Sequence, residues 1–482
     1  MSNPETSARR PRVVVVGAGI SGLSAAWRIT RRRHDIDVLV VDGSDRIGGL
    51  LRVTDLEGIP LDEGAESMLA TRPEAVRLAH DVGLGDSIVH PTAARPRVVI
   101  DGELKEFPVG LMMGVPTELK ALAASGVLSP EALARIPLDY VLPRSSIGED
   151  VSFGGYIAQR LGSDVVDRLV APLIMGVYAD DPYDVSMLSA MPALLSAART
   201  DASILSAANK TKKTPTGPVF AGIDGGIGRL PQALDEGLTA AGVSIRTDAM
   251  VKGLRRTPTG WEVDFVDAER YPSESADAVI VAVPAPAAAR LLRGYVPLAA
   301  DHLGRIETVS VAVVTMLYRS ADLPAGDLPG GSGYLVPPSE GRPVKAATFS
   351  SHKWAWVDRE AAKRGLIAVR ASLGHARDVE VLQRSDEELA DLAASDLGFV
   401  ARLGRAAPIA SRVSRWGGAL PRYPVGFRER VSTIDSAVKS VPRLAICGSA
   451  YEGVGIASCV ARATTAADRI CEHLTSNGQW SS

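Results

Sequence analysis

Three glycines near the start of the chain, Gly17, Gly19 and Gly22, have the G-x-G-x-x-G spacing that can hold the pyrophosphate of a dinucleotide. The first glycine allows a tight turn, the second lets the backbone approach the phosphates, and the third lets the next helix pack closely. Asp42 lies twenty residues after Gly22, where a carboxylate can hold the two hydroxyls of a ribose. These residues together predict a dinucleotide site, and the alternative is a chance glycine turn.

The elements that must position these residues are visible on either side of them. Residues 13–16 are four valines, which is typical of a parallel strand buried on both faces. An Ala-rich helix begins at the glycines, and its N-terminal N–H groups can face the phosphates. A second apolar run at residues 38–41 ends in Asp42. The order strand, helix, strand predicts a βαβ unit of the Rossmann type.

The segment Arg46-Ile47-Gly48-Gly49 favours one dinucleotide over another. It resembles the R-x-G-G that follows the second strand in FAD-dependent oxidases of the amine-oxidase and phytoene-desaturase type. NAD dehydrogenases generally lack this sequence, so the resemblance implies FAD. The alternative is a glycine turn with a solvated arginine.

Composition sets further limits on the class of protein. The chain has 482 residues, of which 46% are hydrophobic, so two or three globular domains are expected. The 53 basic and 56 acidic residues give a net charge of −3, which argues against a general nucleic-acid surface. Three cysteines are too few for a disulfide framework or a zinc site. The first eleven residues lack an apolar segment, and no uncharged run is long enough to span a bilayer, so a cytoplasmic protein is expected.

Later segments predict a mixed α/β chain in which the first domain is interrupted. A short hairpin precedes the turn at residues 64–67, and a helix begins at Arg72-Pro73-Glu74. Residues 107–211 are mostly helical in pattern, and within them 171–181 predict a helix that stops at a glycine turn. Long strands are expected at 309–317 and 366–373, short ones at 243–246, 249–251, 278–283 and 443–447. A helix with a Ser385–Glu388 capping box is expected at 385–397.

Two loops in this outline carry further predictions. Residues 211–218 are polar, basic and rich in turn residues, so they predict an exposed boundary. Residues 448–456 form a glycine loop ahead of a helix that runs to about residue 474, and a helix N-terminus of this kind makes a second anion site.

Taken together, these segments resemble the oxygen-dependent protoporphyrinogen and coproporphyrinogen oxidases, which are flavoproteins of haem synthesis. The likeness covers nearly the whole chain and is strongest to the coproporphyrinogen III oxidases of Gram-positive bacteria. Its more specific segments are PLIMGVYADD at 172–181, residues 225–234, YEGVGI at 451–456, and W-x-x-x-x-P-x-Y-x-x-G from Trp416 to Gly426.

The resemblance implies roles for individual residues. Arg72 lies where relatives pair a side chain with a substrate propionate. The residues implied to bind FAD are Gly17, Ala18, Gly19, Ile20, Ser21, Gly22, Asp42, Gly43, Arg46, Gly48, Gly49, Gly64, Ala65, Glu66, Ser67, Val251, Trp416, Val454, Gly455 and Ile456. No metal ligand and no catalytic side chain is implied, because the flavin accepts the hydride.

Four positions depart from the family pattern. Asp42 replaces the usual Glu, which shortens the reach to the ribose. Leu50 stands where a Lys is common, so no phosphate contact is implied there. Residues 64–67 are GAES instead of GPDS, and Ser372 lies where some relatives have Tyr, which puts a substrate role for that position in doubt.

The activity implied is removal of hydride from a meso carbon of a porphyrinogen to flavin N5, with loss of an N–H proton and reoxidation by dioxygen to give hydrogen peroxide. Three such rounds would aromatise the macrocycle. Coproporphyrinogen III is the expected substrate and protoporphyrinogen IX the alternative. The rivals are another flavin oxidase of the amine-oxidase type and, as a non-enzyme, a prenyl-binding escort protein on the same fold.

The domains expected from this outline are a discontinuous FAD-binding domain at 10–90, 218–298 and 410–482, a helical substrate-binding part at 91–217 and a sheet-containing part at 299–409. The expected partners are a porphyrinogen, dioxygen and the next enzyme of the haem pathway, without nucleic acid. Scattered cations in or near the interposed part, Arg168, Lys212 and Lys213, favour an anionic substrate.

Overall fold

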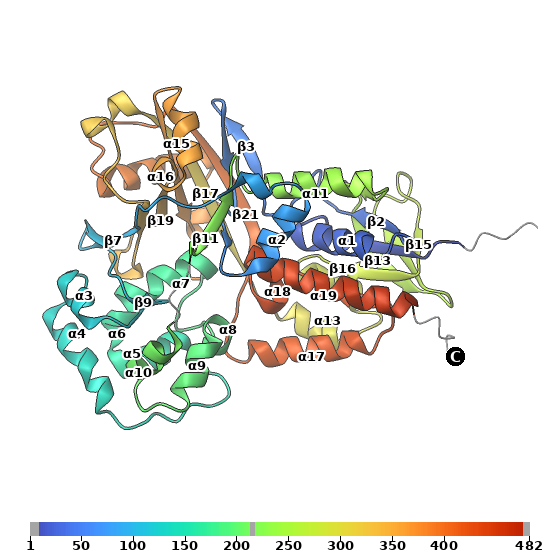
Figure 1. Cartoon of the computed structure of the whole chain (residues 1–482), viewed down its shortest axis with the longest axis horizontal. Coiled ribbons are helices and arrows are strands. Elements are labelled where there is room, and N and C mark those ends of the chain that lie inside the picture. Colours follow the sequence, from blue (N-terminus) through green and yellow to red (C-terminus); the bar gives the residue numbers. More distant parts are fainter. Residues whose placement is uncertain (1–8, 213–216, 476–482) are drawn as a thin grey trace, which may run out of the picture.

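A five-stranded parallel sheet forms the centre of one end of the molecule (Figure 1). The computed structural model describes residues 9–212 and 217–475. Every valine of β1 is buried, as the sequence predicts for a central strand. The sheet, in spatial order, is β12 (Ser244–Arg246), β2 (Asp37–Val41), β1 (Arg12–Val16), β16 (Ala278–Val281) and β22 (Leu444–Ile446).

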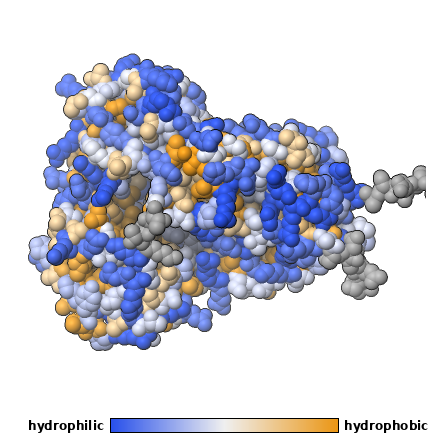
Figure 2. Space-filling view, viewed as in Figure 1, coloured by the Kyte–Doolittle hydropathy of each residue, from blue (hydrophilic) through white to orange (hydrophobic). Residues whose placement is uncertain are grey.

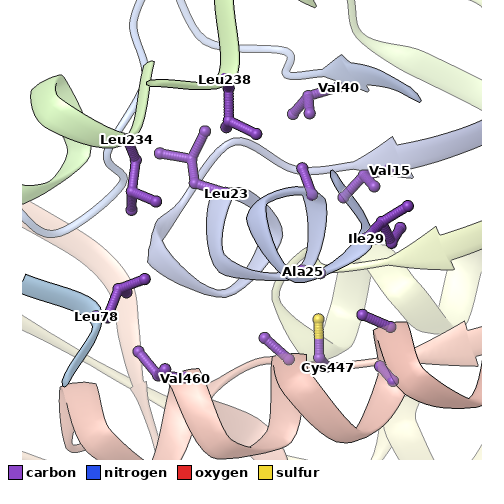
Figure 3. Close-up of a cluster of buried hydrophobic side chains, with 14 of the residues drawn as sticks. Val15, Leu23, Ala25, Ile29, Val40, Leu78, Leu234, Leu238, Cys447 and Val460 are labelled. Carbon is purple, nitrogen blue, oxygen red and sulfur yellow. The ribbon is translucent and has the colours of Figure 1, made fainter. Parts of the chain in front are cut away.

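Three helices cover one face of this sheet: α1 (Ile20–Arg32), α11 (Arg229–Ala240) and α19 (Ile456–Thr475). Figure 3 shows the core between them, where Leu23 of α1 points toward Leu234 and Leu238, and Val460 lies below on α19. The other face packs against β13 (Val251–Arg256), β14 (Trp261–Phe265), β15 (Glu274–Ala276), α12 (Ala285–Leu292), α13 (Pro297–Gly304) and α17 (Phe427–Lys439). This is the expected Rossmann-like arrangement.

A seven-stranded mixed sheet forms the second large body, seen at the upper left of Figure 1. Its spatial order is β21 (Ala410–Pro421), β17 (Thr308–Arg319), β20 (Leu366–Leu373), β19 (Val344–Phe349), β18 (Gly333–Leu335), β7 (Arg97–Ile100) and β8 (Glu103–Glu106). The expected strands at 309–317 and 366–373 are confirmed. Helix α16 (Asp386–Val400) covers one face, and its Ser385–Glu388 capping box is present. Helices α14 (Ser350–Lys353) and α15 (Ala355–Ala362) follow β19.

This sheet pairs strands across the expected domain boundaries. β7 and β8 fall within 91–217, and β21 begins at 410, yet all three belong to the same sheet as β17 and β20. The division into domains stays a prediction, and the sheet shows that its parts are joined by backbone hydrogen bonds.

Residues 111–211 form a helical lobe, seen at the lower left of Figure 1. It starts with the paired strands β9 (Leu111–Met112) and β10 (Val115–Pro116). The helices are α3 (Leu119–Ala124), α4 (Pro130–Arg135), α5 (Phe153–Leu161), α6 (Ser163–Val165), α7 (Ala171–Tyr178), α8 (Met187–Ala190), α9 (Pro192–Ala198) and α10 (Ile204–Thr211). The predicted stop of α7 at a glycine turn is wrong: the helix continues through Gly176 to Tyr178, and Ala179, with a φ of +52°, caps its end.

Shorter elements connect these bodies. The expected hairpin is β3 (Val53–Leu56) with β4 (Ile59–Asp62), and α2 (Pro73–Asp81) begins where Pro73 predicts. A small sheet joins β5 (Met68–Leu69), β11 (Phe220–Ile223) and β6 (Ile88–Val89). α18 (Ser449–Glu452) precedes α19. The strand expected at 249–251 starts only at Val251 and runs to Arg256. The exposed boundary expected at 211–218 falls partly outside the described residues.

Candidate active site

The turn from β1 into α1 accepts only glycine at two of its three glycine positions. Gly17 has a φ of +113°, and a Cβ there would lie 2.5 Å from the carbonyl oxygen of Ala282 on the neighbouring strand end. A Cβ on Gly22 would lie 1.8 Å from the carbonyl oxygen of Gly17. Both glycines therefore serve close backbone packing, as the spacing predicts.

Gly19 differs from its two neighbours, because a Cβ there would meet nothing within 4 Å. It is the N-cap of α1, with extended backbone and no side-chain cap, so the first N–H groups of the helix face this open space. Gly48 pairs with Gly19 as a parallel bridge, and its N–H donates to the carbonyl of Ala18 at 2.8 Å. A bare helix N-terminus beside a space that no protein atom fills fits the pyrophosphate of FAD.

Asp42 ends β2 next to the glycine loop. Its Oδ2 accepts a 2.6 Å hydrogen bond from the N–H of Ala18, and its Oδ1 accepts from the N–H and hydroxyl of Ser44 at 2.8 and 2.7 Å. A Cβ on Gly43 would lie 2.4 Å from Met250, and Val251 is buried at the start of β13. The structure thus brings together the residues expected at the ribose and adenine end of FAD, and those contacts stay predictions.

Arg46 lies between its own R-x-G-G turn and the ring of Trp416. Its guanidinium donates to the carbonyls of Ile47 and Gly49 at 3.3 and 3.0 Å and lies 5.9 Å from the centroid of the Trp416 ring. Burial and the nearby Arg52 lower the pKa of Arg46. The side chain therefore connects the R-x-G-G turn to the strand that carries Trp416.

The turn at residues 64–67 is enclosed from two sides. A Cβ on Gly64 would lie 2.1 Å from the carbonyl oxygen of Leu50 and 3.3 Å from the indole ring of Trp416. Trp416 is buried, and its Nε1 donates to the carbonyl of Glu63 at 3.0 Å. Ala65 and Ser67, which flank Glu66, are partly exposed. Trp416 therefore closes on this turn, and its expected contact with the flavin stays a prediction.

Both carboxylate oxygens of Glu66 are paired with cations. Its Oε1 bonds the ammonium of Lys353, and its Oε2 accepts from Arg370 at 2.7 Å. Burial opposes the charged form of Glu66, but the two cations prevail and lower the pKa of this carboxyl to about 2. The sequence analysis missed Lys353 and Arg370, since they lie 287 and 304 residues after Glu66.

The register of the large sheet shows which side chains share the face that Arg370 occupies. Arg370 pairs with Thr315 and Thr348, and the next residue on this face, Ser372, pairs with Val313 and Ala346. Because side chains alternate between the two faces of a strand, all six lie on the face opposite α16. Ser372 and Ala346 are only partly buried although they lie in inner strands, so open space lies over them.

Helix α7 borders the same space. It packs against β18 and β19, and a Cβ on Gly176 would lie 3.8 Å from Leu335 of β18. Gly176 and Val177 are exposed although their neighbours Ile174 and Met175 are buried. Figure 2 shows the molecule hollowed between the helical lobe and the sheet body. The apolar helix α7 and the inner sheet face therefore both border the partly exposed region at Ser372 and Ala346.

The loop at 453–456 forms the start of α19. Gly453 has a φ of +138°, Val454 is partly exposed, Gly455 is exposed, and a Cβ on Gly455 would meet nothing within 4 Å. Ile456 begins the helix. This loop has the same character as Gly19, an open space at a helix N-terminus, and so fits a second contact to an electron-rich group.

Arg72 lies beside the first turn of α19. Its guanidinium donates to the hydroxyl of Ser458 at 3.0 Å and pairs with Glu74 at 3.0 Å, and its side chain is 42% exposed. Within the described part of the chain its one ion pair is with Glu74 in the first turn of α2, so the partly exposed guanidinium can still reach a carboxylate. The substrate role of Arg72 stays a prediction.

The other expected cations are placed at the edge of the helical lobe. Arg168 donates to the carbonyl of Val127 at 3.1 Å, and Lys212 pairs with Glu118 at 2.7 Å. Lys213 lies outside the described residues. Within the described residues, neither Arg168 nor Lys212 forms a hydrogen bond or ion pair with the residues around Glu66.

A buried ion network joins α7 to β21. Asp180 is 1% exposed and accepts two 2.9 Å hydrogen bonds from Arg422, which also pairs with Glu307 at 2.7 Å. The adjacent Tyr423 stacks edge-on against Tyr178 and donates to the carbonyl of Ser449 at 2.6 Å. Two family-like segments, PLIMGVYADD and W-x-x-x-x-P-x-Y, therefore fix each other and the loop before α19.

The next feature is the set of side chains that could bind a metal ion or react as thiols. Within the described ranges 9–212 and 217–475, no group of three His, Cys, Asp or Glu side chains could hold a metal ion. Cys447, Cys459 and Cys471 are free and buried. Burial raises the pKa of the Cys447 and Cys459 thiols to about 12 and about 11, which disfavours the reactive thiolates.

Comparisons with known proteins agree with this geometry. Residues 20–471 match the family described as flavin containing amine oxidoreductase. Coproporphyrinogen III oxidase of Mycobacterium tuberculosis (strain ATCC 25618 / H37Rv) is 34% identical over 467 residues, which cover 95% of this chain and 97% of that protein. The Bacillus subtilis (strain 168) protein of the same name is 27% identical, with coverages of 97% and 99%.

A solved structure extends the comparison to the fold. A crystal structure from Exiguobacterium sp. 255-15, assigned as a protoporphyrinogen oxidase, superposes with a TM-score of 0.84 at 26% identity. The match covers 96% of this chain and 99% of that one. The arrangement of the two sheets and the helical lobe is thus shared along the full length.

Proposed function

The chain belongs to the flavin containing amine oxidoreductase family, and we propose that it oxidises coproporphyrinogen III to coproporphyrin III with dioxygen as electron acceptor. The observation that carries the proposal is the partly exposed inner face of the large sheet, placed directly beside the 64–67 turn. A partly exposed region bordered by this face and by α7 suits a large flat macrocycle, while partly exposed Arg72 suits a carboxylate arm.

The cofactor is FAD, which accepts hydride from the substrate and passes the electrons to dioxygen. Gly19 and the start of α1 would hold its pyrophosphate, and Asp42 its ribose. The 64–67 turn, Trp416 and the loop at 453–456 would enclose its ring. Hydrogen peroxide is the expected by-product.

The residues of the chain bind and orient the substrate, and they exclude water from it. Trp416 and Val313 are buried on the sheet face, and α7 supplies apolar surface opposite them. Glu66 is unsuited to accept the proton that leaves the porphyrinogen, because a pKa of about 2 makes it a weak base and both of its oxygens are already paired.

The cellular setting belongs to the same proposal. None of the helices in the described parts of the chain has the length and apolar character needed to cross a bilayer. Three free cysteines fit a reducing compartment, so we place the protein in the cytoplasm. Its product would be handed to the next enzyme of haem synthesis, and no nucleic acid is involved.

A direct experiment tests the proposal. Purified protein with FAD is mixed with coproporphyrinogen III in air, and porphyrin fluorescence and hydrogen peroxide are followed against a blank without enzyme. The expected result is fluorescence and peroxide that rise together above the blank. A rise no greater than the autoxidation of the blank would refute the proposed function.

A further inference from the structure

Glu66, Lys353 and Arg370 form a buried ion cluster, here called the Glu66 triad. The carboxylate of Glu66 holds Lys353 on one oxygen and Arg370 on the other, the latter at 2.7 Å. The three side chains are 14%, 21% and 9% exposed. They come from the 64–67 turn, the end of α14 and the middle of β20, so the triad joins the two large bodies of the molecule.

The charges of the Glu66 triad do not cancel. Two cations face one carboxylate, and the low pKa of that carboxylate keeps it fully charged at neutral pH. The Nε of Arg370 is buried and has no hydrogen-bond partner within the described residues. Leaving a buried charge uncompensated costs several kcal/mol, so the excess positive charge points to an anionic group that the protein itself does not supply.

Neighbouring carboxylates supply only part of that anion, because Asp62 interacts with Arg370 but is held partly protonated by burial. Asp62 is buried, and its two oxygens accept the N–H groups of Ile227 and Gly228 at 3.0 and 3.1 Å. Burial also raises the pKa of Asp62 to about 7, so this group carries only part of a charge at neutral pH. Glu63 pairs with Arg412 at 3.2 Å and with Arg52 at 3.3 Å, two cations of its own.

The position of the triad indicates which anion it meets. The second terminal nitrogen of Arg370 donates to the carbonyl of Gly64 at 2.5 Å, and Gly64 in turn lies against the ring of Trp416. The excess charge is therefore built into the turn that we assign to the flavin ring. In a water-poor interior a cation acts on its surroundings more strongly than in water.

We propose that the Glu66 triad is an electrostatic element of the flavin site, whose net positive charge favours the negative charge added on reduction and so raises the flavin reduction potential. The inference rests on the proposed function, because it needs flavin at this turn. Lys353 and Arg370 supply the field, and Glu66 both holds them in place and limits the field to one net charge.

These roles predict that substitution of Lys353 and substitution of Glu66 shift the flavin reduction potential in opposite directions. Lys353→Met removes the excess charge and lowers the potential, whereas Glu66→Gln leaves two cations and raises it. The double variant Glu66→Gln/Lys353→Met keeps one net positive charge and stays near the unmodified protein. If the triad had only a structural role, the reduction potentials of the two single variants and the double variant would shift in the same direction or not at all.

The experiment is a redox titration of the FAD-loaded protein against a reference dye, followed by flavin absorbance. The expected change is roughly tenfold in the equilibrium between oxidised and reduced forms for each single variant, about 30 mV for a two-electron couple. Lys363→Met is the matched control, because Lys363 follows the last residue of α15 with 57% of its side chain exposed, so the potential should stay unchanged. Arg370→Gln makes the same charge change and replaces Lys353→Met if that variant fails to fold.

Each outcome either supports or overturns the inference about the Glu66 triad. Opposite shifts in Lys353→Met and Glu66→Gln, with Lys363→Met unmoved, support the inference. Shifts of one sign, or none beyond the control, overturn it while leaving the proposed function intact if coproporphyrin still forms. Unmodified protein that binds no FAD would refute the proposed function and the inference together.

Discussion

The indole of Trp416 donates a 3.0 Å hydrogen bond to the backbone carbonyl of Glu63, although the two residues are 353 positions apart in the chain. This bond joins the edge strand of the large sheet to the turn that leads into residues 64–67. Together with the ion pairs of Glu66, this bond therefore holds the large sheet against the turn that we assign to the flavin.

Trp416→Phe should weaken the link between the large sheet and the turn at residues 64–67. The change leaves the carbonyl of Glu63 without its donor, which costs about 1–3 kcal/mol for a buried group. We expect a lower midpoint of denaturant unfolding and weaker FAD retention, measured by fluorescence and by dialysis. Trp261→Phe is the matched control: Trp261 is also buried, but its Nε1 has no partner within the described residues. Equal losses of FAD in both variants would contradict a specific role for Trp416.

Local patterns predicted the first part of this site well. Gly17, Gly19 and Gly22 lie within one turn, so their spacing already encodes the shape of the loop. The capping box of Ser385 and Glu388 was predictable for the same reason, because both of its hydrogen bonds lie within one helical turn. Helix α7 was misjudged because a glycine within a helix costs only about 1 kcal/mol, which packing on the sheet offsets.

Contacts between distant segments were not predictable from one sequence. Lys353 and Arg370 carry no local signal, and their role becomes visible only when β20 and α14 are placed beside Glu66. The same holds for the open face at Ser372, since its strand is typical of any buried strand. The resemblance pointed to the 64–67 turn but gave no hint of the cations behind it.

Gly19→Val tests the assigned pyrophosphate space. The branched side chain would enter the space that no protein atom occupies, so folding should be little affected while FAD binding is lost. The measurement is flavin absorbance after gel filtration in dilute FAD, with unfolding followed in parallel. Gly253→Val is the control, because its Cβ also meets open space but lies on β13. Full flavin occupancy in Gly19→Val would contradict the assignment.

Arg72→Ala tests the substrate contact. Loss of a charge-assisted hydrogen bond of about 1.5–3 kcal/mol should raise KM roughly tenfold or more, with flavin content unchanged. Glu74→Ala is the companion variant, since it frees the guanidinium from its 3.0 Å ion pair and should not raise KM. If Arg72→Ala instead loses flavin, the contact with Ser458 on α19 is its main role and the substrate assignment is wrong.

Asp62 should make stability depend on pH. Burial raises its pKa to about 7 in the folded protein, against about 4 for an unfolded aspartate, so the folded state binds the extra proton between these values. The contribution of Asp62 to the free energy of unfolding is therefore largest at acid pH. It falls by up to about 4 kcal/mol as the pH rises to about 7. Asp62→Asn should flatten the difference between pH 5 and pH 8 in denaturant unfolding. An unchanged pH profile would place the folded pKa of Asp62 near its ordinary value.

The substrate preference should favour coproporphyrinogen III over protoporphyrinogen IX. The two share the same ring chemistry, but the first carries four propionates and the second two propionates and two vinyls. Each additional charge-assisted contact contributes about 1.5–3 kcal/mol, so kcat/KM should differ by about tenfold or more if one extra propionate is bound. The partly exposed guanidinium group of Arg72 is the one that we expect to make such a contact. Both substrates are compared in air by porphyrin fluorescence, each corrected with its own blank. A clear preference for protoporphyrinogen IX would reverse the choice of substrate while leaving the flavin chemistry in place.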